Sequence, residues 1–217
     1  PLTDYHRLYD TIVSNLQSDG MNYIFIDEIQ NVPDFEKAIN SLLIKGNVDI
    51  YITGSNAFLL SGELATLLSG RTVEIHVTPL SFSEAFGASA DMKAFRSYMG
   101  GSSFPYARQL DSATDVHTYL EGVYNTVILK DIAARRGIVD VNQLQRVARF
   151  LMSNIGNLTS IKKISDTMTS DGQRISTHAV DSYISSLSEA YLFYPIRRFD
   201  VKGRQLLKTG EKYYVAD

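Results

Sequence analysis

The stretch YIFIDEIQNV, residues 23–32, contains four apolar residues that run directly into two carboxylates, Asp27 and Glu28. A short continuous apolar run, rich in aromatic and β-branched residues, predicts a strand covered on both faces, as in a parallel sheet. Such sheets bind ligands at the carboxyl ends of their strands. The two acids therefore stand where a ligand site is expected, although acids in a surface turn that cap the next helix are the simpler alternative.

The sequence around this stretch predicts an alternation of helices and strands. The expected order is a helix at 5–17, a strand at 23–27, a helix at 33–46, a strand at 48–54, a helix at 57–68 and a strand at 72–77. Elements that alternate in this way over short links predict about half of a parallel α/β sheet with right-handed crossovers.

An apolar strand that ends in Asp-Glu is typical of the Walker B strand of a P-loop NTPase. In that role Asp27 would hold Mg²⁺ through water, and Glu28 would orient or deprotonate the attacking water. The next strand ends on TGSN, residues 53–56, whose small hydroxyl and amide side chains would lie at the same edge of the sheet. The two strand ends together favour a nucleotide site over a turn built only from good turn formers.

Within that segment Thr53 and Ser55 are candidates for binding the nucleotide, and Asn56 or Ser55 is the candidate sensor of the γ-phosphate or the attacking water. Arg71, in LSGR before the third predicted strand, is a candidate for stabilising charge in the transition state. An arginine after a glycine is more often only a solvated surface residue.

No G-x-x-x-x-G-K-[ST] loop occurs anywhere in the 217 residues. Without this loop the sequence lacks both the backbone N–H groups and the lysine that bind the phosphates of a nucleotide. That loop normally precedes the Walker B strand by many tens of residues, whereas only 22 residues precede Tyr23. Truncation or disorder is the expected explanation, and we expect no hydrolysis by this fragment alone.

The pattern changes after residue 79. Residues 80–105 mix short helical pieces with GASAD and GGSSFP, and residues 115–136 predict a helix. Residues 80–136 together predict a helical linker or lid. Residues 137–217 predict helices at 141–155, 160–168 and 176–190, followed by two strands around a turn. Three helices and a two-stranded wing are the pattern of a winged-helix domain, with the start of a further domain at its end. The expected fold class is thus α/β, a partial P-loop NTPase sheet followed by a helical linker and a winged helix.

The third helix of this region is a poor DNA-recognition helix, because it contains two acids and no lysine or arginine. The wing region instead has six basic residues against two acids. Its candidate nucleic-acid contacts are Arg197, Arg198, Lys202 and Arg204. A solvated hairpin whose charges prevent aggregation, or a protein-binding surface, is the alternative.

Composition excludes several other classes of protein. The net charge of −3 argues against a protein that binds nucleic acid over most of its surface. The absence of cysteine excludes thiolate metal sites, disulfides and a cysteine nucleophile. Four widely spaced histidines do not form a metal-binding pattern. No apolar run reaches the ~18 residues that a membrane span needs, and no signal-peptide pattern opens the chain, so we expect a soluble, cytoplasmic protein.

Several stretches in order strongly resemble one protein family. YIFIDEIQNVPDFEKAINSL and VDIYITGSNAFLLSGELATLLSGRTVEIHVTPLSFSEA resemble the prokaryotic AAA-type ATPases often grouped with the STAND NTPases. The segments YLEGVYNTVILKDIAARRGI, LMSNIG, THAVDSYISSLSEAYLFYPI and KYYVAD are similar to the second half of that family, a domain of unknown function in which a winged helix leads into a restriction-endonuclease-like fold.

The resemblance implies ATP binding with Mg²⁺. It matches Asp27 and Glu28 to the Walker B acids, residues 53–56 to the sensor 1 segment and Arg71 to a Gly-Arg of the family. The chain stops at Asp217, where the nuclease-like domain of the family would start, so no nuclease chemistry is assigned.

The leading hypothesis is therefore an ATP-driven switch or ATPase. The state of the nucleotide would be relayed from Asp27, Glu28 and Asn56 through residues 80–136 to the winged helix. The alternative is a winged-helix module that binds nucleic acid or a protein partner and whose NTPase half is structural. The sequence leaves open the partner and whether the protein forms a homo-oligomer.

Overall fold

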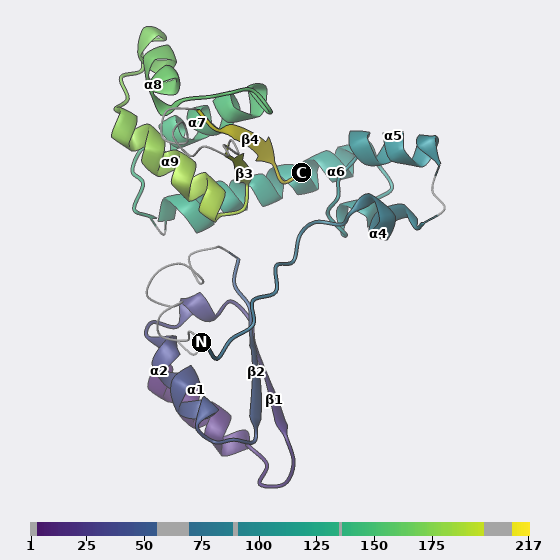
Figure 1. The fold of residues 1–217 in the computed structure, drawn as a ribbon, viewed down its shortest axis with the longest axis vertical. Helices are drawn as coiled ribbons and strands as arrows, with labels where there is room; N and C mark the ends of the chain where they lie inside the picture. Colours follow the sequence, from purple (N-terminus) through teal and green to yellow (C-terminus); the bar gives the residue numbers. More distant parts are fainter. Residues whose placement is uncertain (1–3, 56–69, 89–90, 135, 198–209) are drawn as a thin grey trace, which may run out of the picture. The chain divides into compact units, whose positions relative to one another are not determined.

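The computed structural model describes residues 4–55, 70–88, 91–134, 136–197 and 210–217 (Figure 1). The chain divides into two compact units, Pro1–Ile75 and His76–Asp217. No helix in these described ranges is long and apolar enough to cross a membrane.

The first unit is a small α/β layer. Its elements are α1 (Tyr5–Asn15), β1 (Asn22–Ile26), a 3₁₀ turn η1 (Ile29–Asn31), α2 (Phe35–Leu43) and β2 (Val48–Ile52). The two strands pair in parallel with Ile26 opposite Ile52, which confirms the predicted parallel pairing. Figure 1 shows α1 and α2 on one side of the strands, where Leu8, Phe35 and Ile39 are buried against Ile26, Ile50 and Ile52.

The other face of these strands is open in the described part of the chain. Tyr23, Phe25 and Tyr51 are 63%, 74% and 45% exposed. The ring of Phe25 stacks on that of Tyr51 at 4.9 Å between centroids. The prediction of a strand covered on both faces is therefore wrong for this structure, because the described helices of this unit cover only one face.

The strand predicted at 72–77 is also wrong. These residues form no strand, and Val73, Ile75 and Val77 are exposed. An apolar run becomes a strand only where a neighbouring strand satisfies its backbone groups, and the described residues place no strand beside this one. The helix predicted at 57–68 lies outside the described residues.

The second unit is mostly helical. Its elements are α4 (Phe82–Phe86), α5 (Met92–Gly100), η3 (Ala107–Gln109), α6 (Ala113–Thr126), the π-helical η4 (Val127–Ala134), α7 (Val141–Ser153), α8 (Ile161–Ser170), α9 (Thr177–Glu189), β3 (Phe193–Ile196) and β4 (Lys212–Val215). The last two strands pair antiparallel, with Phe193 opposite Val215. An isolated bridge joins Thr159, between α7 and α8, to Glu211. The helices and strands predicted for residues 137–217 are thus present.

The core of this unit lies between α7, α8, α9 and the strands. Its fully buried side chains include Ile128, Leu144, Val147, Leu151, Ile164, Val180, Leu187 and Phe193. The predicted helix at 115–136 changes to π-helical geometry at Val127. Ile128, Ile132 and Ala133 of this segment are buried, four and five residues apart, and a turn of the π-helix lies between these two spacings.

The end of the chain is tied to the loop after α5. The carboxylate of Asp217 accepts hydrogen bonds from the Ser102 hydroxyl at 2.5 Å and the Ser103 backbone N–H at 2.6 Å. The Ser103 hydroxyl also donates to Asp217. Both serines are buried, so this carboxylate satisfies polar groups that water reaches poorly.

Candidate functional site

The ends of β1 and β2 bring four of the predicted site residues together, namely Asp27, Glu28, Thr53 and Ser55. Beyond the last strand pair, the Thr53 N–H donates to the Ile26 carbonyl at 2.9 Å, and the Ile29 N–H donates to the Thr53 carbonyl at 3.1 Å. Backbone pairing therefore continues past both strands. It holds the residues after Ile26 and those after Ile52 at one edge of the sheet.

Thr53 connects the two acids. Its hydroxyl donates to Oδ1 of Asp27, and its oxygen accepts the backbone N–H of Glu28 at 3.2 Å. A hydroxyl can donate and accept at once, so one side chain fixes the first carboxylate and the backbone of the second. Asp27 and Thr53 are both exposed and accessible to a ligand at this edge.

Glu28 has an unusual backbone conformation. Its φ and ψ angles are 52° and 49°, in the left-handed region that a residue with a side chain rarely adopts. Such a conformation costs on the order of 1–3 kcal/mol and is concentrated at functional sites. The half-buried side chain accepts a hydrogen bond from the Ser55 hydroxyl at 3.1 Å.

Gln30 is a member of this cluster that the sequence prediction missed. Its side-chain Nε2 contacts Oε2 of Glu28 and lies 3.4 Å from Oγ of Ser55. The adjacent Ile29 is completely buried and anchors the turn. A carboxamide two residues after the Asp-Glu pair is the only sequence signal for this contact, and it is weak on its own.

Two predicted residues of the nucleotide site remain, and only one of them is described. Asn56 lies outside the described residues. Arg71 is exposed, and in the described part of the chain it forms no ion pair or hydrogen bond with Asp27 or Glu28. The structure therefore groups Asp27, Glu28, Thr53 and Ser55 but leaves Arg71 apart.

The donor set at this edge suits a hard cation. Carboxylate and hydroxyl oxygens are the ligands that Mg²⁺ prefers, and it is usually bound by one or two carboxylates together with water and phosphate oxygens. No cluster of three or more histidine, aspartate or glutamate side chains occurs among the described residues. Asp27 thus fits a water-mediated Mg²⁺ role but would not hold the ion alone.

The predicted nucleic-acid contacts lie mostly beyond the described residues. Arg198, Lys202 and Arg204 fall in the undescribed stretch 198–209. Arg197 is described, and its Nε lies 2.9 Å from Oε1 of Glu211. Glu211 also accepts a hydrogen bond from the Tyr213 hydroxyl at 2.9 Å, and burial followed by that bond raises the pKa of Tyr213.

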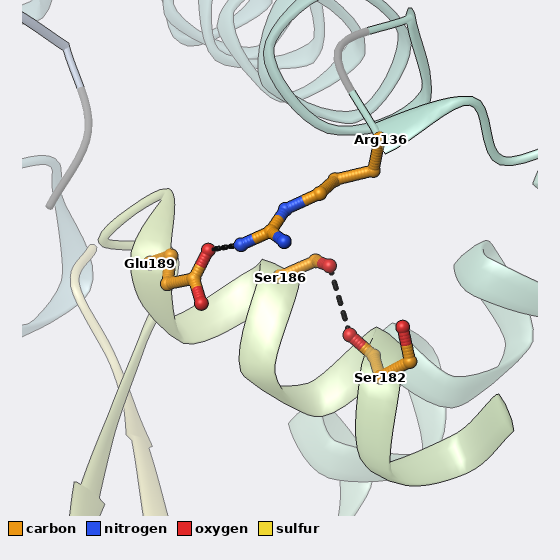
Figure 2. Close-up of polar contacts among 4 residues, drawn as sticks. All are labelled: Arg136, Ser182, Ser186 and Glu189. Atoms are coloured by element: carbon orange, nitrogen blue, oxygen red, sulfur yellow. Dashed lines mark hydrogen bonds and ion pairs between the residues drawn. The ribbon is translucent and has the colours of Figure 1, made fainter. Parts of the chain in front are cut away.

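The exposed face of α9 is neutral to acidic. Figure 2 shows Arg136 reaching the carboxylate of Glu189 near the end of α9, with Ser182 and Ser186 along the same helix. A hollow of about 270 Å³ beside them is also lined by His178 and Asp181. Because the arginine here is paired with a carboxylate, this face offers little excess positive charge for a phosphate backbone.

A second hollow, of about 400 Å³, is strongly polar and has a cationic lining. It lies along α7 and the turn before α9, and its lining residues are Asn142, Gln145, Arg146, Arg149 and Gln173. None of the five is acidic. Within the described residues neither arginine forms an ion pair.

Residues 2–86 match the family model of an AAA domain, and residues 92–217 match that of a domain of unknown function, DUF8612. The chain belongs to the DUF8612 family. The AAA match encloses the acids and hydroxyls at the ends of β1 and β2, and it supports a P-loop NTPase-like fold for that part of this DUF8612 protein.

Two curated relatives are similar to this DUF8612 protein over most of its length. An uncharacterized protein of Haemophilus influenzae is 43% identical over 202 residues, which cover 90% of this chain and 50% of the relative. An uncharacterized protein of Methanocaldococcus jannaschii is 26% identical over 208 residues, which cover 89% and 46%. The chain thus spans about half the length of the curated relatives it matches.

Proposed function

We propose that the full-length protein is an AAA-type switch that binds and hydrolyses ATP. One observation carries the proposal: Asp27 and Glu28 are hydrogen-bonded to Thr53 and Ser55 where two parallel strands end, within a segment that matches an AAA domain. Ligands of parallel sheets bind at this edge. At this edge Asp27 would serve Mg²⁺ and Glu28 the attacking water, which are two of the roles that phosphoryl transfer uses.

Each residue has a separate role in this proposal. Asp27, held by Thr53, would bind Mg²⁺ through water, and Glu28 would accept a proton from the attacking water while Ser55 orients its carboxylate. Bound with Mg²⁺, ATP supplies the γ-phosphoryl group that is transferred to water. Asn56, next to Ser55 in the sequence, is proposed as the sensor, and Arg71 as a charge that stabilises the transition state in cis or towards a neighbouring subunit.

The 217 residues contain no G-x-x-x-x-G-K-[ST] loop, so we expect them to hydrolyse no ATP by themselves. The activity is therefore tested in the full-length protein.

We further propose that residues 1–79 are part of the ATPase core, residues 80–136 a linker or lid, and residues 137–217 a winged-helix domain. The order α7, α8, α9, β3, β4 supports the winged helix. So does the Thr159–Glu211 bridge, because it places a short extended segment between the first two helices beside the hairpin.

Replacing Glu28 by glutamine tests the ATPase. Glu28→Gln keeps the shape of the side chain but removes the base, so turnover of ATP by the full-length protein should fall about 100-fold or more while ATP binding is retained. Steady-state kinetics and titration with a fluorescent ATP analogue measure the two effects. Glu121→Gln, the same change at an exposed position of α6, is the control. Unchanged turnover of ATP in Glu28→Gln would contradict the assignment of Glu28 as the base.

A second candidate function is nucleic-acid binding by the helical unit, with a structural NTPase-like part. The polar hollow on α7 favours it, since Arg146 and Arg149 lie one helical turn apart beside three carboxamides and no acid. Arg197 and Arg198 of the hairpin are the additional candidates that the sequence indicates.

Neutralising the α7 arginines tests this second function. If they contact phosphates, Arg146→Gln with Arg149→Gln should weaken binding of a labelled DNA duplex, and the salt slope should fall by about 1 for each arginine removed. Fluorescence anisotropy over a salt series measures both quantities. Lys93→Gln with Arg96→Gln removes two exposed charges from α5 and is the control. Equal losses in both double variants would show only a dependence on net charge.

A further inference from the structure

The contact between Gln30 and Glu28 closes a small hydrogen-bonded triangle. Oε2 of Glu28 accepts from Nε2 of Gln30 and from the Ser55 hydroxyl at 3.1 Å, and Nε2 of Gln30 lies 3.4 Å from that hydroxyl. The triangle joins the turn after β1 to the end of β2. Two donors at one oxygen limit the positions that the carboxylate can take.

The orientation of the Gln30 amide follows from the charge that it faces. Its Oε1 is buried and accepts no hydrogen bond within the described residues. Turning the amide over would point this oxygen at the carboxylate, where two acceptors would repel each other. In the observed orientation the Gln30 N–H groups face Glu28, and its Oε1 has no hydrogen-bond partner among the described residues. A bond to an ionised acceptor is strong enough to offset that cost.

The backbone of the turn does not depend on the side chain of Gln30. Ile29 is completely buried, and its N–H donates to the Thr53 carbonyl at 3.1 Å. Within the turn the Asn31 N–H donates to the Glu28 carbonyl, and the Val32 N–H donates to the Ile29 carbonyl, both at 3.0 Å. Removing the carboxamide should leave these bonds in place and change mainly the freedom of the Glu28 carboxylate.

We propose that Gln30 is a positioning residue, which holds the Glu28 carboxylate in the orientation needed to accept a proton from the attacking water. The inference rests on the proposed ATPase function and adds to it a residue that acts through the Glu28 carboxylate. The left-handed residue Glu28 directly precedes the 3₁₀ turn that contains Gln30.

Kinetics of the full-length protein test the positioning role. Gln30→Ala and the similarly sized Gln30→Met should each lower kcat for ATP about 10- to 100-fold, the effect of losing one hydrogen bond to a charged group. KM should change by less than about threefold, because nucleotide contacts are retained. Asn31→Ala is the matched control, since this neighbouring side chain is exposed and its backbone bond remains.

A cycle of melting temperatures tests the contact without relying on activity. The shifts caused by Glu28→Ala and Gln30→Ala should not add in the double variant, whereas those of Glu28→Ala and Asn31→Ala should add. Additive shifts for Glu28 and Gln30 would overturn the inference, as would normal kcat in the Gln30 variants of an active enzyme. A wild-type protein that neither binds nor hydrolyses ATP would overturn the proposed function, and with it the catalytic role of Gln30, even if the cycle confirms the contact.

Discussion

At the scale of single residues, Thr53 is the most informative position to change. Its hydroxyl donates to Asp27 and accepts the N–H of Glu28. Thr53→Val keeps the shape and removes both bonds, so the Mg²⁺ concentration for half-maximal turnover of the full-length protein should rise about tenfold or more, as for other partners of metal-binding side chains. Thr53→Ser should restore it. A magnesium titration that gives the same midpoint for all three proteins would contradict the assignment of Asp27.

Sequence patterns could predict Asp27, Glu28, Thr53 and Ser55 as one group, because each follows directly after a strand and parallel strands end at a common edge. Gln30 could not be predicted in the same way. Its contact with Glu28 is made within the turn after β1, where Glu28 has a left-handed backbone that no local pattern of residue types specifies. Position at the end of a strand therefore predicts which residues lie close together, whereas a contact made within the turn after the strand is not predicted in this way.

At the scale of elements, helices with their own boundary signals were predicted best. Asp140, Ser160 and Ser176 begin α7, α8 and α9, and each side chain accepts a backbone N–H of the first turn. These caps and the apolar spacing are both local, so the sequence contains the information. The strand predicted at 72–77 depended on a neighbouring strand, and its apolar run was no evidence that such a neighbour exists.

The same contrast explains the error about β1. A continuous apolar run indicates that both faces of a strand are hydrophobic, but it does not indicate which elements cover them. In the described part of the first unit, α1 and α2 cover the isoleucine face, whereas Tyr23 and Phe25 remain exposed. Hydrophobicity therefore predicted the strand and its pairing correctly but not its layers.

At the scale of the whole molecule, the two compact units divide at residue 75, close to the change in sequence character at 79. One long-range contact within the second unit could not be predicted from the sequence. Asp217 and Ser103 are 114 residues apart, and neither belongs to a motif that would indicate the other. Periodicity and turn signals extend over about one element, so they carry no information about such a long-range contact.

The contact of Asp217 connects the end of β4 to the loop after α5, and we expect it to stabilise that loop. In Asp217→Ala the buried N–H of Ser103 loses its acceptor, and the second unit should lose about 1–3 kcal/mol of stability. Amide hydrogen exchange at Ser103 should then accelerate about tenfold or more, while amides of α1 and α2 are unchanged. Asp171→Ala, at an exposed aspartate, is the control. Equal protection of Ser103 in both variants would mean that the carboxylate does not hold this loop, and that α4 and α5 are retained by their own contacts with the rest of the unit.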